Sequence, residues 1–142
     1  MEYNFDSEEF RDSSIYKNFM NINNGKGILK IEASTASEAY PLKDVEITIS
    51  KRLDGANVIF YKGVTNDSGI IDGIVLPTRA MTNEVNDVSD IFFTTYDLVA
   101  KIPKYDVEKD YDVSIFDNVK VIQPITFPVN DLIEGDSVEQ QS

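Results

Sequence analysis

Carboxylates are the side chains of this sequence that most readily suggest chemistry. The chain of 142 residues has 25 Asp and Glu against 13 Lys and Arg. Two carboxylates that face each other across a fixed gap can hydrolyse a glycosidic bond, and Glu84, Asp87 and Asp90 lie together in one polar segment. Such catalysis also needs a cleft and shifted pKa values, which no pattern in the sequence indicates. We therefore expect no catalytic residues and no enzymatic activity.

Histidine and cysteine are both absent, which excludes Ser-His-Asp and Cys-His catalysis, His-ligated metals, thiolate zinc sites and disulfides. The best remaining candidate for a cation site is the segment TNDSGIIDGIVLP, residues 65–77. A calcium loop needs carboxylates at alternating positions and a distal Glu, which Asp67 and Asp72 do not provide. We expect Asn66 to Gly69 to form a turn before a strand. We expect no cofactor and no metal, although cation binding by the acidic loops stays open.

Three lysines, Lys30, Lys62 and Lys101, raise the question of an isopeptide bond of the kind that closes in some adhesin sandwiches. Such a bond needs a Lys at an inward strand position beside a buried acid. Lys30 and Lys101 fall on the polar faces of their expected strands, and burying a charged Lys is costly unless its charge is paired. We therefore expect no isopeptide bond.

Two groups of apolar side chains are candidates for binding a partner. One lies on a single face of a helical turn near the N-terminus. The other is an aromatic cluster where a long polar loop, residues 77–93, enters a strand; such rings stack on sugars or anchor a protein partner, or they plug the end of a core. The candidate interaction residues are Ile15, Tyr16, Phe19, Met20, Phe92, Phe93 and Tyr96.

The N-terminal residues 1–24 differ from the rest of the chain. Asp6 or Ser7 is placed to cap a short helix that has Glu8 and Glu9 in its first turn. Three interpretations are open: a short helix that covers one end of the core, a disordered leader, or an arm that docks on a neighbouring subunit.

From Gly27 onward the hydrophobic pattern has a period of two, which is typical of strands with one buried face. About seven such strands, separated by turns, predict an all-β antiparallel sandwich. Pro124, inside the last strand, favours an edge position or a bulge. We expect an N-terminal arm or short helix at 1–24, the sandwich at 25–131, and an acidic flexible tail at 132–142. The alternating sets are Leu29, Ile31, Ala33; Val45, Ile47, Ile49; Tyr96, Leu98, Ala100, Ile102; Tyr111, Val113, Ile115; and Val119, Val121, Gln123, Ile125, Phe127.

The net charge and the hydropathy of the chain limit the classes of partner that we expect. The formal net charge of −12 repels phosphate backbones and anionic membranes, so we expect no nucleic-acid binding. The N-terminus lacks the basic and apolar regions of a signal peptide, and no apolar run is long enough to span a bilayer. We expect synthesis in the cytoplasm, no membrane insertion, and protein partners or self-association.

Several motifs together resemble the transthyretin-like β-sandwich, also called prealbumin-like or carboxypeptidase regulatory-like. They are GILKIEASTA, YPLKDVEI, TNDSG, LPT, YDL and VKVIQP, and the match covers about Gly27 to Val129. The chain looks most similar to the form found in spore-associated and cortex-lytic proteins of spore-forming Firmicutes. One departure is Lys104-Tyr105, where relatives have a glycine before the tyrosine, so we expect that turn to differ from theirs.

The resemblance implies a non-catalytic structural or interaction module. Its expected setting is a spore layer or another self-assembling surface structure. One alternative is a phage or phage-tail-like virion component, which is also made without a signal peptide. Another is a module that binds carbohydrate or peptidoglycan through the aromatic end.

Overall fold

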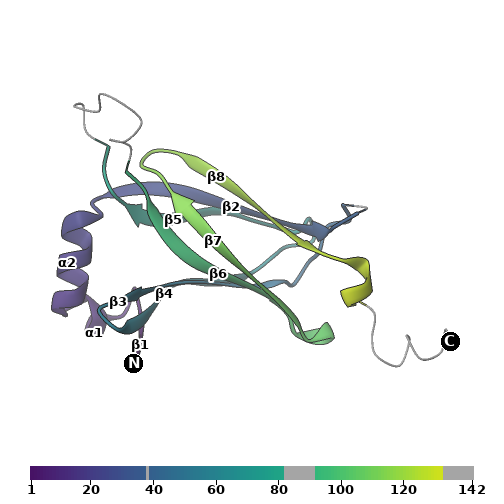
Figure 1. The fold of residues 1–142 in the computed structure, drawn as a ribbon, viewed down its shortest axis with the longest axis horizontal. Helices are drawn as coiled ribbons and strands as arrows, with labels where there is room; N and C mark the ends of the chain where they lie inside the picture. The colour runs from purple at the N-terminus through teal and green to yellow at the C-terminus, as the bar shows by residue number, and fades with distance from the viewer. Residues whose placement is uncertain (38, 82–91, 133–142) are drawn as a thin grey trace.

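Two β-sheets packed face to face form the body of the protein in a computed structural model. The structure describes residues 1–37, 39–81 and 92–132. The helices α1 and α2 lie at one end of the sandwich and the short helical turn η2 lies at the other (Figure 1). The all-β sandwich with a short N-terminal helical segment, predicted from the alternating pattern, is confirmed.

The larger sheet has five strands in the order β1-β4-β3-β6-β7. Its hairpin between β3 and β4 turns at Asp54 and Gly55, both with positive φ, as expected of an Asp-Gly pair. Strand β7 is an edge strand. The strands are β1 (Glu2–Asn4), β3 (Glu46–Leu53), β4 (Ala56–Val64), β6 (Thr94–Ile102) and β7 (Val107–Ile115), with η2 (Pro103–Tyr105) joining the last two.

The smaller sheet has three strands in the order β5-β2-β8: β2 (Gly25–Thr35), β5 (Ile70–Thr78) and β8 (Lys120–Phe127), followed by η3 (Val129–Leu132). Strand β8 pairs with β2 in parallel and has no second partner among the described strands. The expected edge position of Pro124 is therefore confirmed. The backbone amide of Thr126 donates to the Tyr111 hydroxyl at 3.3 Å, which covers part of the outer edge of β8.

The N-terminal segment folds back on its own domain. Strand β1 pairs in parallel with β4 and covers that edge of the larger sheet. Helices α1 (Glu8–Arg11) and α2 (Ser14–Ile22) follow. Ser7 is the N-cap of α1, and its hydroxyl accepts a hydrogen bond from the amide of Phe10 at 3.2 Å. Of the three interpretations of residues 1–24, the helix that covers one end of the core describes this arrangement.

The core lies between the sheets and is closed at the α2 end by aromatic rings. The side chain of Phe10 is fully buried and that of Phe19 is 6% exposed. Phe60 links the helices to the core, because its ring lies 5.5 Å from that of Phe19 and 4.9 Å from that of Tyr96. The predicted inward sets of β2, β3 and β6 are buried here, as their alternation requires. In the set predicted for β8 only Ile125 and Phe127 are buried, whereas Val121 and Gln123 are half-buried and Val119 is 44% exposed just before the strand, so that prediction is correct only for the second half of the strand.

Candidate functional site

A cleft lies at the end of the sandwich that holds η2. Its volume is about 540 Å³, within the range of small-molecule sites. One wall is the loop before β3 together with the first residue of β3, and the other wall is the end of β6 with η2. The pairing of Glu46 with Lys101 in neighbouring strands holds the two walls together. The lining residues are Pro41, Leu42, Lys43, Asp44, Glu46, Ile102, Pro103, Lys104 and Tyr105.

The lining of the cleft combines apolar surface with charges of both signs. Leucine, isoleucine and proline side chains and the Tyr105 ring supply the apolar part. The ammonium group of Lys104 lies 5.4 Å from the centroid of that ring, in the range of a cation–π contact. Such a mixture of apolar surface and a few polar groups is what orients a small ligand in a binding site.

Thr65 holds the first wall of the cleft in place. Its side chain is 1% exposed, and its hydroxyl donates to the carbonyl of Leu42 at 2.6 Å and accepts from the amide of Val45 at 3.0 Å. The amide of Asp44 donates to the Thr65 carbonyl at 3.0 Å. The loop is therefore fixed by a buried hydroxyl on the neighbouring strand end.

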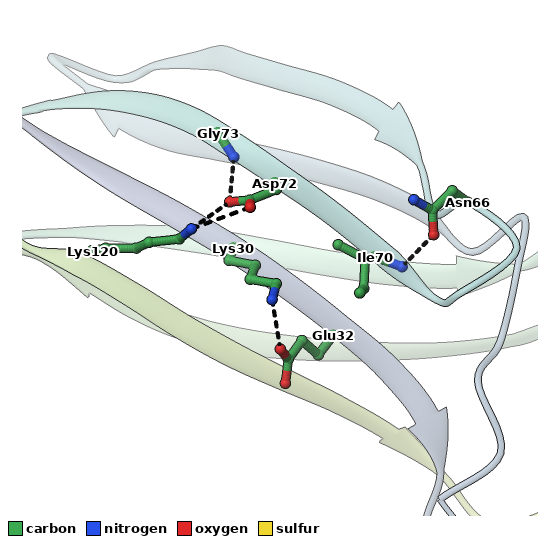
Figure 2. Close-up of polar contacts among 7 residues, drawn as sticks. All are labelled: Lys30, Glu32, Asn66, Ile70, Asp72, Gly73 and Lys120. Carbon is green, nitrogen blue, oxygen red and sulfur yellow. Dashed lines mark hydrogen bonds and ion pairs between the residues drawn. The ribbon is translucent and has the colours of Figure 1, made fainter.

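The turn Asn66 to Gly69 supports the same wall from behind. The side-chain oxygen of Asn66 accepts hydrogen bonds from the amides of Ser68 and Ile70, at 2.9 and 3.0 Å, and Figure 2 shows the second of these. Gly69 has φ +76, and a Cβ there would overlap the carbonyl oxygen of Ala33. That carbonyl also accepts from the amide of Leu42 at 3.0 Å. The turn predicted from TNDSG is confirmed, and its place in the fold is beneath the cleft loop.

Backbone strain is concentrated around this cleft. Ala39, Asp44 and Asp106 have φ of 55, 59 and 53. Asp44 lines the cleft, and Ala39 and Asp106 lie just beyond the two lining segments. Asp106 follows η2 as its left-handed C-cap, a position that usually favours glycine. The departure at Lys104-Tyr105 therefore falls in a tight turn that forms one wall. Residues in sparsely populated backbone regions tend to occur at functional sites.

The outer face of β5-β2-β8 carries two ion pairs (Figure 2). Lys30 lies 3.1 Å from Glu32 on the same strand, and is not beside a buried acid as an isopeptide would require. Lys120 of β8 reaches Asp72 of β5 at 3.0 Å. The hydrogen bond from Lys120, and then that from the Gly73 amide, holds the pKa of the Asp72 carboxyl below its usual range.

We expect Lys120→Gln to raise the pKa of Asp72. A lowered folded-state pKa stabilises the protein at neutral pH, and this contribution is lost as the pH falls below about 4 towards the folded pKa. The effect on stability is small because the pair is exposed. The side-chain ¹³C titration of Asp72 by NMR measures the shift. Lys26→Gln is the matched control and is expected to leave the Asp72 midpoint in place; an unchanged midpoint in Lys120→Gln would contradict the assignment.

The predicted interaction residues lie in different environments. Phe19 and Tyr96 are buried, and the Tyr96 hydroxyl donates to the Pro77 carbonyl at 2.5 Å while burial raises the pKa of that hydroxyl. Ile15, Tyr16 and Met20 are half-buried on α2. Phe92 and Phe93 are 37% and 50% exposed.

These residues do not gather on one exposed surface. Phe19 and Tyr96 both contact the ring of Phe60 inside the protein. Phe93 instead packs against Phe116, and Arg79 lies over the ring of Phe92. Whether any of the seven binds a partner stays a prediction.

The other candidate chemistry has no counterpart among the described residues. Glu84, Asp87 and Asp90 lie outside the described residues, as does the tail from 133 onward. Within the described ranges, no three acidic side chains are grouped as a metal site would require. None of the described helices is long and apolar enough to cross a bilayer.

The cleft was not predicted from the sequence. The departure at Lys104-Tyr105 was the one signal that pointed to it, because it marked one wall as unusual. The opposite wall, with Lys43 and Asp44, looked like an ordinary polar loop. Only the pairing of β3 with β6 brings these two segments together.

Comparisons with known proteins give a likeness in structure. No family model matches the chain, and no curated protein matches it. Among solved structures, it is similar to 5-hydroxyisourate hydrolase of Klebsiella pneumoniae, with 15% sequence identity and a TM-score of 0.45. The match covers 70% of this chain and 90% of the hydrolase. At this similarity the match assigns no activity to the chain, while the two-sheet architecture is in line with the transthyretin-like resemblance at the level of the fold.

The predicted function is corrected by this comparison. The expectation of a non-catalytic structural or interaction module rested on the idea that sandwiches of this type are not themselves enzymes. The matched structure is a hydrolase, so that step from fold to function is wrong. No finding supports a spore layer, a virion or a glycan-binding module as the setting of this chain.

Proposed function

We propose that this chain binds a small molecule in the cleft between the loop before β3 and η2. The observation that carries the proposal is the lining, which joins apolar surface to Lys43, Asp44, Glu46 and Lys104 in a volume of about 540 Å³. The anchoring of the loop through Thr65 supports it, because a wall that is fixed before binding loses little entropy on binding.

A thermal-shift screen tests the proposal. The probes are a library of small carboxylic acids, amines and amino acids with aliphatic or aromatic bodies. We expect members of the library to raise the melting temperature of the native protein, since a ligand that binds only the folded state stabilises it. Lys43→Trp places a large side chain in the cleft and is expected to abolish the shift. Lys17→Trp, on the exposed side of α2, is the matched control.

The same two variants show which result would contradict binding in the cleft. If Lys43→Trp retains the ligand-induced shift of the native protein, the ligand binds elsewhere and the cleft is not the site. A library without a single stabilising member would contradict the proposal as well.

We also propose that two copies of the chain associate through the outer face of β5-β2-β8. Ile28, Val75 and Ile122 are 39%, 56% and 52% exposed on that face, and Ile28 pairs directly with Val75. The Lys30–Glu32 and Lys120–Asp72 pairs neutralise charge there, so two such faces can meet without the repulsion that a net charge of −12 causes elsewhere. An apolar centre with a charged rim is the usual anatomy of an interface.

Light scattering measures this association. We expect the mass of a dimer for the native chain and the mass of a monomer for Val75→Glu, which places a charge in the apolar centre. Val64→Glu is the matched control, since Val64 is 55% exposed on β4 of the other sheet. A monomeric native chain would contradict this proposal and would leave the cleft unaffected.

Three narrower expectations stay proposals. We propose that the chain is not an enzyme, that it is related to the form of this sandwich found in spore-forming Firmicutes, and that it is made in the cytoplasm. The absence of His and Cys supports the first, because the commonest general base and the commonest thiol nucleophile are missing.

A further inference from the structure

We propose that the α2 end of the sandwich binds a segment of a partner protein that carries carboxylates on both sides of apolar side chains. This surface lies at the end of the molecule opposite η2 (Figure 1), so it is separate from the cleft and does not depend on the proposed function. It consists of two grooves that adjoin at Ile22, which we call the α2 grooves. The first has a volume of about 320 Å³ and the second of about 250 Å³.

The α2 grooves share an apolar centre. Ile22, in the last turn of α2, lines both grooves and is 53% exposed. Ile15, Phe19 and Leu53 line the first groove, and Phe92 lines the second. Ile15 and Phe92, two of the residues predicted to bind a partner, therefore lie in adjoining grooves. Exposed apolar surface with a polar rim is typical of a site that binds another protein.

The helix end that carries Ile22 is fixed before any partner binds. Asn23 is the C-cap of α2 and is buried. Its side-chain amide donates to the Phe19 carbonyl at 3.0 Å, and its side-chain oxygen accepts from the Thr94 hydroxyl at 2.5 Å. Because Thr94 belongs to β6, this contact attaches α2 to the larger sheet. A surface that is already ordered loses little conformational entropy on binding.

Each groove is lined by one arginine. Arg52 lines the first groove and Arg79 the second, and both are exposed. The Nη2 group of Arg52 donates to the Gly55 carbonyl at 2.9 Å, and the guanidinium of Arg79 lies 5.8 Å from the centroid of the Phe92 ring. In the described ranges neither arginine forms an ion pair. Their other N–H groups can bind a carboxylate through two parallel hydrogen bonds.

The carboxylates near the α2 grooves do not balance both arginines. Asp54 lines the first groove with Arg52, and among the described residues no carboxylate lines the second groove. The carboxylate of Asp117, close to the second groove, accepts from the amides of Lys26 and Met81 at 3.2 and 3.0 Å. The lining therefore carries two arginines against one aspartate, an excess of positive charge on a chain whose net charge is −12.

This lining favours an acidic partner segment over the other classes. A basic segment is repelled by Arg52 and Arg79, and an uncharged apolar segment covers the arginines without pairing them. A segment with carboxylates around apolar side chains satisfies both parts of the lining. The net charge of −12 opposes its approach, but at physiological salt charges more than about 8 Å away are largely screened. The two arginines therefore decide the contact locally.

Three blocked pentapeptides test the class of partner. Each is acetylated and amidated and has leucine, phenylalanine and leucine in the middle, with glutamate, glutamine or lysine at both ends. Each is titrated into ¹⁵N-labelled protein, and the amide shifts of residues 15–24, 52–55 and 79–81 are followed by NMR. We expect the glutamate peptide to bind about tenfold or more tightly than the glutamine peptide, the effect of losing charge-assisted hydrogen bonds. The lysine peptide is expected to bind most weakly.

A double charge reversal assigns this preference to the two arginines. Arg52→Glu combined with Arg79→Glu is expected to bind the lysine peptide more tightly than the glutamate peptide. Lys62→Glu combined with Lys101→Glu is the matched control, because it changes the net charge equally at exposed positions of β4 and β6. The control is expected to retain the preference for glutamate.

Two further variants keep the test decisive if the charge reversal unfolds the protein, which a thermal melt shows. Arg52→Gln combined with Arg79→Gln is expected to abolish the preference for the glutamate peptide. Ile22→Asp, at an exposed position, is expected to weaken binding of the glutamate and glutamine peptides, because it places a charge in the apolar centre.

Several results would overturn the proposal. Equal binding of the glutamate and glutamine peptides, or tighter binding of the lysine peptide by the native chain, would show that the partner is not acidic. A preference for glutamate that survives the removal of both arginines would show that the α2 grooves do not cause it. Shifts confined to residues 41–46 and 102–105 would place the peptide in the cleft, and the absence of shifts with all three peptides would mean that this surface binds no such segment.

Discussion

Gly69→Ala is expected to destabilise the protein by about 3 kcal/mol, from about 1–2 kcal/mol for a left-handed residue with a Cβ and a further penalty for overlap in a packed site. The reason is specific to this position, because a Cβ on Gly69 would overlap the Ala33 carbonyl oxygen. That oxygen also accepts the hydrogen bond from Leu42 of the cleft loop, so we expect weaker ligand binding as well. Urea unfolding measures the change in free energy.

Gly73→Ala is the matched control for this prediction. Gly73 has the same φ of +76, and a Cβ there would have nothing within 4 Å. The control therefore carries the backbone strain without the overlap and is expected to lose about 1–2 kcal/mol. Equal losses in the two variants would mean that the turn does not press against the cleft loop.

Phe10→Ala is expected to cost about 3–5 kcal/mol of stability, the usual loss for a buried phenylalanine. Its side chain is fully buried, and its ring lies 5.3 Å from Tyr3, 6.0 Å from Phe5 and 5.7 Å from Tyr16. The variant removes the centre of an aromatic cluster within the N-terminal segment, and Phe5 of that cluster stacks on Phe60 of β4 with ring centroids 4.6 Å apart. Thermal or urea unfolding, followed by circular dichroism, measures the loss.

Phe93→Ala is the control for the N-terminal prediction, because its side chain is 50% exposed and its loss is expected to be small. If Phe10→Ala were as mild as this control, the N-terminal segment would not be docked on its own domain. The interpretation of residues 1–24 as an arm that docks on a neighbour would then regain support.

The strands of the sandwich could be predicted because burial follows the period of the sequence. In β6, Tyr96, Leu98 and Ala100 are buried, and the residues between them, Asp97 and Val99, are exposed or half-buried. The short strand β1 could not be predicted, since Glu2–Asn4 is too brief to show a period and pairs with a distant strand. The register shift at Ile49/Ser50 was missed for a similar reason, because a bulge depends on the partner strand.

The candidate site was less predictable than the fold. Turn chemistry at Asn66 and Gly69 could be recognised from their types alone, but nothing local to that turn shows that it supports the loop at Leu42. The cleft joins residues near 43 with residues near 104, and that proximity depends on the pairing of β3 with β6. Burial was also easier to predict than function. Tyr96 was predicted both on the inward face of a strand and as a candidate for binding a partner, and its fully buried side chain lies in the core.

The most direct test of the central claim is a map of backbone amide shifts on ¹⁵N-labelled native protein titrated with the screening library. Binding in the cleft predicts that the largest shifts fall in residues 41–46 and 102–105, with smaller ones at Thr65 and Gly69 behind the loop. Shifts that cluster elsewhere, or no shifts with any member of the library, would contradict the claim that this cleft is a binding site.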